Sequence, residues 1–434
     1  MRPDAGDSGG DRGQKAVMGD GVLFVHNNFP AQFRDLAQTL MARGVRCAAI
    51  GQSTAPGLQD LTMGRYGLGR GTTPGILPFA VRAEADLIRA SGAFRMAKAL
   101  KEKGFDPAVI VGHPGWGETI FLDEVWPQAK QVLFAELFYK GHGLDVDFDT
   151  EFHETTEEAV LRAKAKSAMM ALAFTNAAAI VAPTEFQAST LPSIFHPRVR
   201  IIHEGVDVDA IRPGPAEPFA LSDGRAIAPG TPVITYVNNN LEPMRGLHIF
   251  ARALPRLMAE APDAQVLVFG HDNPRPYGGP PPEGKSWRQV AFEGLEFDRS
   301  RLHFLGKTDH VRMLAGLRLS TAHVYYTYPF VLSWSLVEAM ASGCYIIASD
   351  TAPLHDAIED GVNGRLLPFF DADALSRALI EACRNPRAAA PLRAAARTTA
   401  VEKFASRDGR EAWIRLLREF GVQIPEPVSR SGPA

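Results

Sequence analysis

The stretch 328–350 places a single carboxylate in a helix that has a clear end. Apolar residues recur there at helical spacing, and Gly343 stands where helices commonly stop. Glu338 is the only charged side chain of this helix. A carboxylate in this position either faces solvent or accepts hydrogen bonds from two neighbouring hydroxyl groups of a ligand. The buried strand expected over 345–348 follows directly.

His113 is a second residue whose setting favours chemistry over packing. It lies in the glycine-rich loop 112–118, which follows a buried strand expected over 106–111. Ligand sites in open α/β sheets lie beyond the carboxyl ends of the strands, which is where this loop begins. Glycine and proline around His113 give the loop little means to bury the ring. We therefore expect His113 to contact a ligand.

The first ordered part of the chain has the pattern of a strand, a polar loop and a helix. A strand over 21–26 runs into the loop 27–32, a helix over 33–43 follows, and a second strand covers 45–50. Such a βαβ unit presents the free amides and the positive dipole end of a helix, which suit a phosphate or an acceptor anion. A plain connecting loop is the other interpretation, and the sequence leaves both open.

Strands and helices alternate twice along the chain, which predicts two doubly wound α/β domains that face each other. Pro, Gly and Ala are dense over 212–232, which marks an interdomain linker. One long helix is expected over 156–176, and helices over 393–402 and 407–419 would pack back across the domain junction. The predicted parts are a disordered leader (1–19), an N-terminal acceptor-side domain (20–208), a linker (209–231), a C-terminal nucleotide-sugar domain (232–405), a return helix (406–421) and a flexible tail (422–434).

Composition narrows the class of protein. The 434 residues are 46% hydrophobic and 22% charged, as in ordinary soluble globular proteins. A formal net charge of −3 without a long basic run gives no reason to expect nucleic acid as a partner. Three cysteines in apolar settings suggest neither a disulfide framework nor a metal site, so a cytoplasmic location is expected. No apolar run approaches the ~18 residues of a membrane span, and the leader lacks the apolar core of a signal peptide.

Residues 328–367 resemble the donor-binding segment of retaining glycosyltransferases of the family-4 type. The positions that match the family wording are Glu338, Gly343, Asp350, Gly361, Asn363 and Gly364. The segment 24–33, the His-Pro-Gly-Trp-Gly-Glu run at 113–118 and the Glu-Leu-Phe-Tyr run at 136–139 look like a bacterial subgroup of the same family. The resemblance therefore spans residue 21 to about residue 370.

The resemblance implies the GT-B fold, in which two Rossmann-like domains face each other, and a transferase that needs neither a metal nor a cofactor. A sugar would move from a nucleotide-diphosphate donor, a UDP- or GDP-sugar, to an acceptor hydroxyl in bacterial glycan or glycoconjugate biosynthesis. Anomeric configuration would be retained, and the departing phosphate would deprotonate the acceptor. Asp145 and Asp147 lack an evident third ligand for a metal ion.

Carried over residue by residue, the resemblance places a catalytic set at His113, Arg245 and Glu338. Arg245 stands where the family has a phosphate-binding lysine, and a guanidinium can hold two phosphate oxygens at once. Glu338 would accept hydrogen bonds from the ribose hydroxyls, and His113 would orient or polarise the reacting sugar. The residues expected to bind the donor are Asn240, Arg245, Gly270, His271, Gly306, Lys307, Phe330, Val331, Leu332, Ser333, Trp334, Ser335 and Glu338.

Three positions depart from the family pattern. Phe330 occupies the place of an acidic residue, which suggests that the hydroxyls of the donor sugar are recognised differently. Asn240 replaces an arginine and so removes one positive charge from the donor site. Ala31 stands where the subgroup commonly has glycine, and its methyl group would narrow the access of a phosphate to the first loop.

The acceptor would bind to the N-terminal domain and could be a glycan, a lipid-linked sugar or another hydroxyl compound. The basic helix around 89–103 is expected to face solvent, with peripheral contact to the inner face of the membrane as the alternative. Aromatic rings in this domain would suit sugar faces but could equally belong to the core. The residues proposed for the acceptor are Asn28, Gln32, Trp116, Glu136 and Tyr139.

Two other functions fit parts of the pattern. A sugar-nucleotide-binding or scaffold protein with reduced activity is motivated by Phe330, Asn240 and Ala31. A nucleotide-sugar epimerase of the same fold would need acidic and histidine groups around the donor sugar, and the sequence does not assemble them. We therefore expect an enzyme that transfers a glycosyl group.

Overall fold

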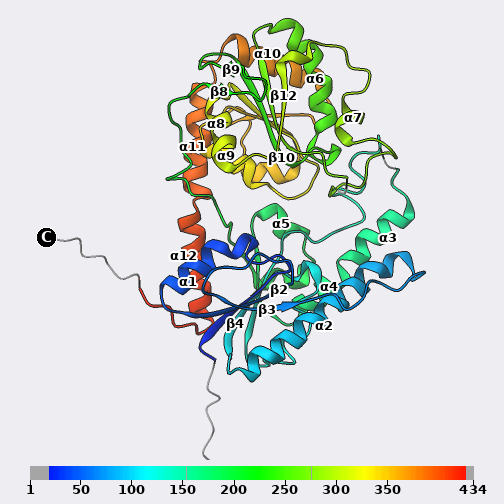
Figure 1. Cartoon of the computed structure of the whole chain (residues 1–434), viewed down its shortest axis with the longest axis vertical. Helices are drawn as coiled ribbons and strands as arrows, with labels where there is room; N and C mark the ends of the chain where they lie inside the picture. Colours follow the sequence, from blue (N-terminus) through cyan, green and yellow to red (C-terminus); the bar gives the residue numbers. More distant parts are fainter. Residues whose placement is uncertain (1–18, 153, 275, 427–434) are drawn as a thin grey trace, which may run out of the picture.

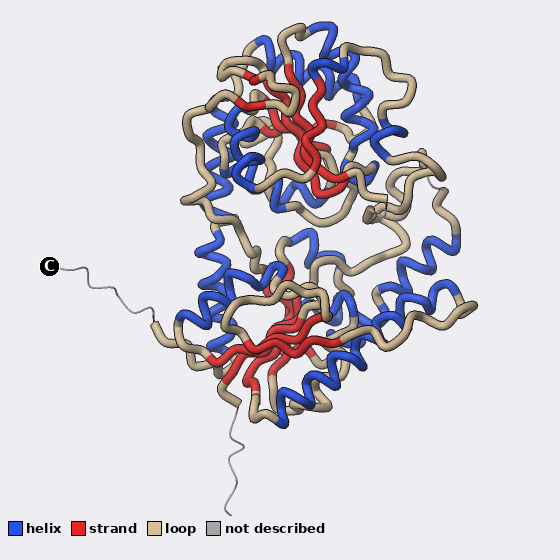
Figure 2. Tube along the Cα trace, in the orientation of Figure 1, coloured by secondary structure: helices blue, strands red, loops and turns tan. Residues whose placement is uncertain are grey.

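The computed structural model describes residues 19–152, 154–274 and 276–426 and consists of two α/β domains (Figure 1). Each domain is built around a parallel sheet (Figure 2), which confirms the prediction of two doubly wound domains. The predicted leader lies outside the described residues except for Gly19, and so does the predicted tail beyond residue 426. Val422 and Ile424, which we expected in a flexible tail, are buried in the N-terminal domain.

The N-terminal sheet has seven parallel strands in the order β3-β2-β1-β4-β5-β6-β7. Its strands are β1 (Gly21–Val25), β2 (Arg46–Gln52), β3 (Thr62–Tyr66), β4 (Pro107–Gly112), β5 (Lys130–Phe134), β6 (Ala177–Ala182) and β7 (Val199–Ile201). Its helices are α1 (Arg34–Ala42), α2 (Val81–Glu102), α3 (Glu157–Lys166), α4 (Ala168–Thr175) and α5 (Glu185–Thr190). Successive residues of a strand face opposite sides, so Val22 and Phe24 pack with α1, while Leu23 and Val25 pack with α2.

The C-terminal sheet has six parallel strands in the order β12-β11-β10-β13-β14-β15. Its strands are β10 (Val233–Asn240), β11 (Gln265–His271), β12 (Leu302–Gly306), β13 (Ala322–Tyr325), β14 (Ile346–Ser349) and β15 (Arg365–Leu367). Its helices are α6 (Leu247–Glu260), α7 (Trp287–Ala291), α8 (His310–Leu319), α9 (Trp334–Ala341) and α10 (Ala372–Arg384). In both sheets the strand order reverses beside the first strand, β1 or β10, and such a switch point is where open α/β sheets bind ligands.

The last two helices join the domains. α11 (Ala390–Lys403) packs on the C-terminal domain through Ala396 and Ala400, and α12 (Ser406–Glu419) packs on the N-terminal core through Trp413. Between them the chain pairs with Val206, whose amide donates to the carbonyl of Phe404 at 2.9 Å. The predicted return of the C-terminal helix to the first domain is therefore confirmed (Figure 1).

Two local expectations differ from the structure. The helix expected over 156–176 breaks at Ser167, whose hydroxyl donates to the carbonyl of Tyr139 at 3.1 Å. The linker contains a hairpin of β8 (Phe219–Ala220) and β9 (Ala226–Ile227), which packs on the C-terminal core.

The basic helix around 89–103 faces solvent as predicted, with exposed cations at Arg95, Lys98, Lys101 and Lys103. Arg89 is the exception, since it is partly buried and lies 3.8 Å from Asp86. The ammonium of Lys101 also donates to the carbonyl of Val125 at 2.5 Å. Across the described ranges, no helix combines the length and the apolar content that crossing a bilayer requires.

Candidate active site

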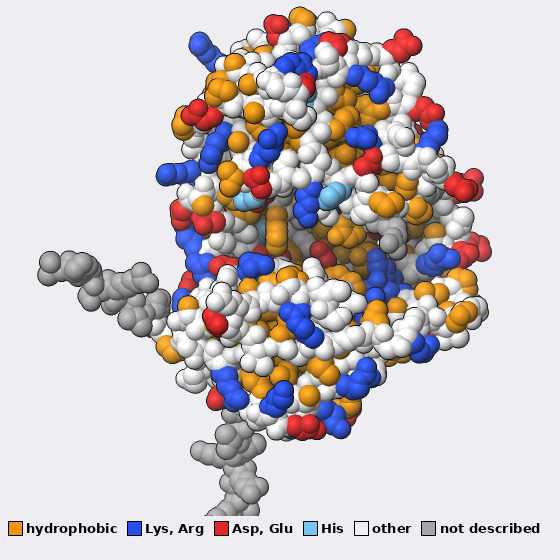
Figure 3. All heavy atoms as spheres, in the orientation of Figure 1, with side chains coloured by type: hydrophobic (Ala, Val, Ile, Leu, Met, Phe, Trp, Pro, Cys, Tyr) orange, Lys and Arg blue, Asp and Glu red, His pale blue; other side chains and the backbone are white. Residues whose placement is uncertain are grey.

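Residues that follow strands of the two sheets meet in a cleft between the domains, where the surface is hollowed (Figure 3). Glu136 follows β5 of the N-terminal domain, and Arg245 follows β10 of the C-terminal domain. The positive charge of Arg245 contributes to lowering the pKa of Glu136, which places the two side chains within electrostatic reach. Figure 3 shows acidic and basic side chains on both walls of this cleft.

His113 lies at the carboxyl end of β4 with its ring fixed from one side. Its Nδ1 accepts a hydrogen bond from the amide of Gly115 at 3.0 Å, so the neutral ring carries its proton on Nε2. This Nε2 lies 3.3 Å from Oε2 of Glu136. A side chain at position 115 would lie 2.6 Å from the His113 ring, which explains why this residue is glycine. The sequence correctly placed His113 in a loop, but the structure buries it to 3% exposure among other rings.

Those rings come from the first loop and from Trp116. The centroids of His26 and Trp116 lie 5.4 Å and 4.7 Å from that of His113. Burial and the charge of His113 lower the pKa of His26 to about 2, so His26 is neutral. Its Nδ1 accepts a hydrogen bond from the amide of Asn28 at 2.9 Å. His26 therefore shapes the first loop and supports His113 rather than carrying a proton.

Glu136 is the ionised partner of His113. Loss of contact with water acts to raise the pKa of Glu136. The hydrogen bond and charge of His113, with the charges of Arg245 and Lys166, outweigh this effect and lower the pKa overall. The side chain keeps 49% of its surface exposed. The carboxylate is therefore charged at neutral pH and open to a ligand.

Arg245 is held under the cleft by neutral groups. Its Nη1 donates to the hydroxyl of Thr327 at 3.0 Å and to the carbonyl of Val331 at 3.3 Å, and the side chain is 8% exposed. The guanidinium carbon lies 5.4 Å from the ring centre of Phe330. Within the described residues no carboxylate forms an ion pair with Arg245. Its charge therefore remains available to an anionic ligand.

The turn that carries Arg245 depends on one glycine. Gly246 ends the turn Pro243–Arg245 with a φ of +71°, and a side chain there would meet Tyr326 at 2.3 Å. Only glycine satisfies both conditions, so the backbone fixes where the arginine enters the cleft.

Glu338 has a partner that the sequence did not reveal. Its Oε1 lies 2.7 Å from Nε2 of His310, which begins α8, and its own side chain is 16% exposed. Burial raises the pKa of Glu338, and the hydrogen bond and charge of His310 act against that rise. The one local signal near His310 is Asp309, an N-cap residue that indicates the start of a helix and caps α8 in the structure.

The segment before α9 uses part of its own hydrogen-bonding capacity. The amide of Ser333 donates to the hydroxyl of Tyr325 at 2.9 Å, and the hydroxyl of Ser335 donates to the carbonyl of Val237 at 3.2 Å. Leu332 is buried and Trp334 is 45% exposed. The amides of this segment are thus not all free for a donor, although Val331 lines the Arg245 site through its carbonyl.

The other residues expected at the donor lie at the carboxyl ends of their strands. Gly270 has a φ of +149°, and a side chain there would meet the carbonyl oxygen of Asn238 at 2.5 Å. Asn240 is buried and its Oδ1 accepts a hydrogen bond from Asn273 at 3.3 Å. The remaining three residues, His271, Gly306 and Lys307, are exposed at the ends of β11 and β12.

Two family models match the chain on either side of the linker. Residues 43–211 match the model described as glycosyl transferase family 4 group, and residues 231–385 match the model for glycosyl transferases group 1. Each of the two domains thus matches a glycosyltransferase family model, and both halves of the cleft carry the likeness.

Solved structures share the fold of this chain. Sucrose-phosphate synthase from Thermosynechococcus elongatus superposes with a TM-score of 0.68 over 92% of this chain and 98% of its own, at 18% identity. HepE of Anabaena, solved in complex with UDP-glucose, gives a TM-score of 0.62 over 92% of this chain and 100% of its own, at 14% identity. These likenesses confirm the GT-B fold predicted from the sequence.

Curated relatives match a shorter segment. The phosphatidyl-myo-inositol mannosyltransferase of Mycolicibacterium smegmatis is 30% identical over 183 residues, which are 41% of this chain and 41% of that protein. The D-inositol 3-phosphate glycosyltransferase of Mycobacterium ulcerans is 30% identical over 207 residues, 46% of this chain and 41% of that protein. The matched segment thus spans about two fifths of the length of each relative.

In this chain the residues predicted for the acceptor are divided between two places. Trp116 lies against His26 and His113, Asn28 is exposed, and Gln32 is partly buried in the first loop. Tyr139 lies farther along the cleft, with the ammonium of Lys166 3.3 Å from its ring centre. Ala31 has a φ of +41°, so the first loop keeps the left-handed turn that usually calls for glycine.

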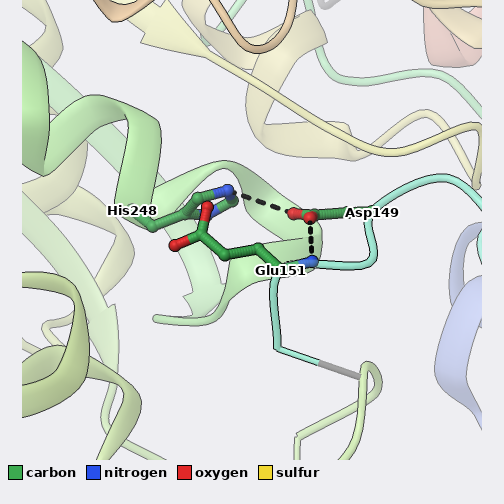
Figure 4. Close-up of side chains that lie close together, drawn as sticks. All are labelled: Asp149, Glu151 and His248. Atoms are coloured by element: carbon green, nitrogen blue, oxygen red, sulfur yellow. Dashed lines mark hydrogen bonds and ion pairs between the residues drawn. The ribbon is translucent and has the colours of Figure 1, made fainter. Parts of the chain in front are cut away.

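The segment 144–152, which we call the arm, reaches from the N-terminal domain to α6. Asp149 accepts a hydrogen bond from the hydroxyl of Tyr328 at 2.5 Å and lies 3.1 Å from Nε2 of His248 (Figure 4). Glu151 forms a two-pronged ion pair with Arg252. The arm therefore ties the two domains together beside the cleft.

Asp149, Glu151 and His248 also offer three ligand atoms within 4.8 Å of one another. This group is not recognisable in the sequence, because His248 lies about a hundred residues from the two acids. Arg252 already neutralises Glu151, and Tyr328 occupies an oxygen of Asp149. A metal ion would have to displace both, so the geometry favours a hydrogen-bonded latch.

Proposed function

We propose that this protein transfers a sugar from a UDP- or GDP-sugar to an acceptor hydroxyl in bacterial glycan or glycoconjugate biosynthesis, with retention of configuration. The observation that carries the proposal is the placement of Arg245. It is a nearly buried cation, has no ion-pair partner among the described residues, and lies within electrostatic reach of the His113–Glu136 pair on the other domain. A leaving diphosphate needs such a charge in the transition state.

The comparisons agree with a nucleotide-sugar donor. HepE binds UDP-glucose, and the curated relatives are named as a mannosyltransferase and a glycosyltransferase. In this chain the remaining guanidinium nitrogens of Arg245 would hold the diphosphate, while Nη1 stays bonded to Thr327 and Val331. Glu338 would accept hydrogen bonds from the ribose hydroxyls with the oxygen that His310 leaves free.

The N-terminal domain would hold the acceptor against the donor sugar. The Nε2 proton of His113 would bond a hydroxyl of that sugar, and Glu136 would receive a hydroxyl of the acceptor. In the reaction the bond from the anomeric carbon to the diphosphate breaks, and the acceptor oxygen bonds to that carbon on the same face. The acceptor proton passes to the departing phosphate oxygen. Arg245 then compensates the charge that remains on the diphosphate.

A thermal-shift panel with UDP, GDP, ADP and their common sugars tests the donor site. Wild type should melt at a higher temperature with one nucleotide, because ligand at a hundred times its dissociation constant adds about 2.7 kcal/mol. The shift should disappear in Arg245→Met and shrink in Glu338→Gln. Lys98→Met, an exposed cation on α2, is the matched control and should behave as wild type.

Enzymatic turnover completes this test. Wild type should slowly hydrolyse the nucleotide sugar that binds, and His113→Ala should abolish hydrolysis while the nucleotide still raises the melting temperature. Failure of every nucleotide to shift the melting temperature of wild type would contradict the proposal. A shift without any hydrolysis or transfer would instead support a sugar-nucleotide-binding protein.

A further inference from the structure

A cavity of about 510 Å³ lies beside the cleft and is walled by both domains. The N-terminal domain contributes the arm, α3 and Tyr139, and the C-terminal domain contributes Met244, Tyr328 and the segment 277–280. Neither domain closes this cavity alone, since the arm forms one wall only while its latch to α6 is made. This cavity could not be predicted from the sequence, because the residues of its walls lie far apart along the chain.

Asp145 and Lys166 line this cavity, within electrostatic reach of each other. Oδ1 of Asp145 is buried and has no hydrogen-bond donor among the described residues. Burial raises the pKa of Asp145, while a backbone hydrogen bond and the charge of Lys166 act against that rise. Lys166 forms no ion pair with any described residue and rests on the ring of Tyr139 instead. The cavity therefore holds one acceptor and one cation that a ligand could satisfy.

Tyr139 and Tyr277 connect the cavity to the proposed reaction centre. The charge of Glu136 contributes to raising the pKa of both tyrosines, so both lie within electrostatic reach of that carboxylate. Glu136 in turn lies 3.3 Å from His113. Tyr277 is 66% exposed, and Tyr139 is partly buried. A molecule in the cavity would thus have the aromatic faces of two tyrosines beside it, and both tyrosines lie within electrostatic reach of Glu136.

The chemistry of the walls selects among ligand classes. An acyl chain would leave Asp145 and Lys166 without polar partners, which is unfavourable for groups removed from water. A polyphosphate would meet the carboxylates of Asp145, Asp149 and Glu154 against the single unpaired ammonium of Lys166. A sugar ring offers an apolar face to a tyrosine and hydroxyls that both donate and accept hydrogen bonds.

We propose that this cavity is the acceptor site and that it takes a saccharide, with a hydroxyl bonded to Asp145 and a ring face on Tyr139 or Tyr277. The assignment rests on the proposed transferase function, because it makes the ligand of the cavity the acceptor. It differs from the earlier expectation of an acceptor at Asn28, Gln32 and Trp116. It leaves those residues beside His113.

Saturation-transfer NMR on the full chain tests the proposal without requiring turnover. The probes are methyl α-glucoside, methyl α-mannoside, methyl β-galactoside and octyl β-glucoside, each with wild type, Asp145→Ala, Lys166→Met and the exposed control Asp263→Asn. Asp145→Ala removes a carboxylate whose buried Oδ1 lacks a donor, so it should fold as well as wild type, and a thermal melt checks this.

At least one glycoside should receive saturation from wild type and from Asp263→Asn. Its affinity should fall about tenfold in Asp145→Ala, since one hydrogen bond to a charged group is lost. For octyl β-glucoside the ring protons should receive more saturation than the chain. No transfer to any glycoside, equal affinity in Asp145→Ala, or stronger transfer to the octyl chain would each overturn the proposal.

The nucleotide panel separates the two claims. Nucleotide binding should be equal in wild type, Asp145→Ala and Lys166→Met, because Arg245 and Glu338 are intact in all three. Nucleotide binding without glycoside binding would overturn the saccharide cavity alone. Glycoside binding without nucleotide binding would contradict the transferase function, and with it the role of the bound saccharide as an acceptor.

Discussion

Asp149 anchors the arm, and its replacement by asparagine tests whether the arm holds the domains together. Its Oδ2 accepts a hydrogen bond from Tyr328 at 2.5 Å and lies 3.1 Å from Nε2 of His248, while Oδ1 accepts from the amide of Glu151 at 2.9 Å. The side chain is only 2% exposed. Asparagine has the same shape as aspartate. Its NH₂ group, however, would point at a group that now donates to Asp149, so two donors would face each other.

The size of the effect follows from the pKa of Asp149. Burial acts to raise that pKa, but the hydrogen bonds from His248, Tyr328 and the Glu151 amide lower it from 3.8 to about 2. A difference of about two units corresponds to about 2.5 kcal/mol. Because the folded value lies below the unfolded one, this stabilisation is present above about pH 4 and is lost as the pH falls toward 2.

Urea unfolding at neutral pH should therefore show Asp149→Asn to be about 2 to 3 kcal/mol less stable than wild type. The difference should narrow as the pH is lowered to about 3. A cycle with Tyr328→Phe measures the contact itself, and we expect a coupling energy of at least about 1 kcal/mol. Asp263→Asn, an exposed acid of the C-terminal domain, controls for the loss of charge.

Two results would refute this reasoning. One is a loss of less than about 0.5 kcal/mol at neutral pH, which is the range of ordinary surface substitutions. The other is additivity of Asp149→Asn and Tyr328→Phe, which would mean that the bond between the domains contributes nothing. Small-angle scattering measures the domain arrangement directly, since a weakened contact of Asp149 with Tyr328 and His248 should increase the radius of gyration of the folded variant.

Three further perturbations test single features. Because φ is +41° at Ala31, Ala31→Gly should be as stable in urea as wild type or up to about 1 kcal/mol more stable, whereas Ala31→Val should lose stability. The reverse order of stabilities would contradict the left-handed turn. Burial raises the pKa of Glu204 from 4.5 to about 7, so Glu204→Gln should stabilise by about 2 to 3 kcal/mol at about pH 8 and by nothing below about pH 4.5. His310→Ala should raise the pKa of Glu338 further, so the nucleotide-induced thermal shift of the variant should weaken more steeply than that of wild type as the pH is lowered below neutral. Parallel pH profiles for the two proteins would argue against that role of His310.

The fold could be predicted because the signals that specify it are local. Buried strands such as β1 and β4 are continuous apolar runs, and Gly343 ends α9 with a φ of +76° as the sequence indicated. Helix periodicity and glycine position depend on neighbours within a few residues, so one sequence is enough to read them. The break at Ser167 was missed because its cause, a hydrogen bond to Tyr139, comes from residues far away in the chain.

The candidate site was only partly predictable for the same reason. Strand order brings loops together, so His113 and Arg245 could be placed at carboxyl ends of strands before their distances were known. The partner of Glu338 could not be found, since His310 precedes it by 28 residues and belongs to another helix. The arm and the cavity are likewise made by packing between domains, which leaves no periodic trace in the sequence.

The departures at Phe330 and Asn240 gain a physical meaning from the surroundings of Arg245. An acidic residue at position 330 would stand beside the guanidinium and could neutralise it, whereas the ring of Phe330 packs 5.4 Å from the guanidinium carbon and leaves the charge uncompensated. Asn240 is neutral and bonded to Asn273, so it adds no cation. The two changes offset each other, because the site gives up one positive charge and also one negative charge. If the cleft binds a diphosphate as proposed, Arg245 is the residue on which we expect that binding to depend.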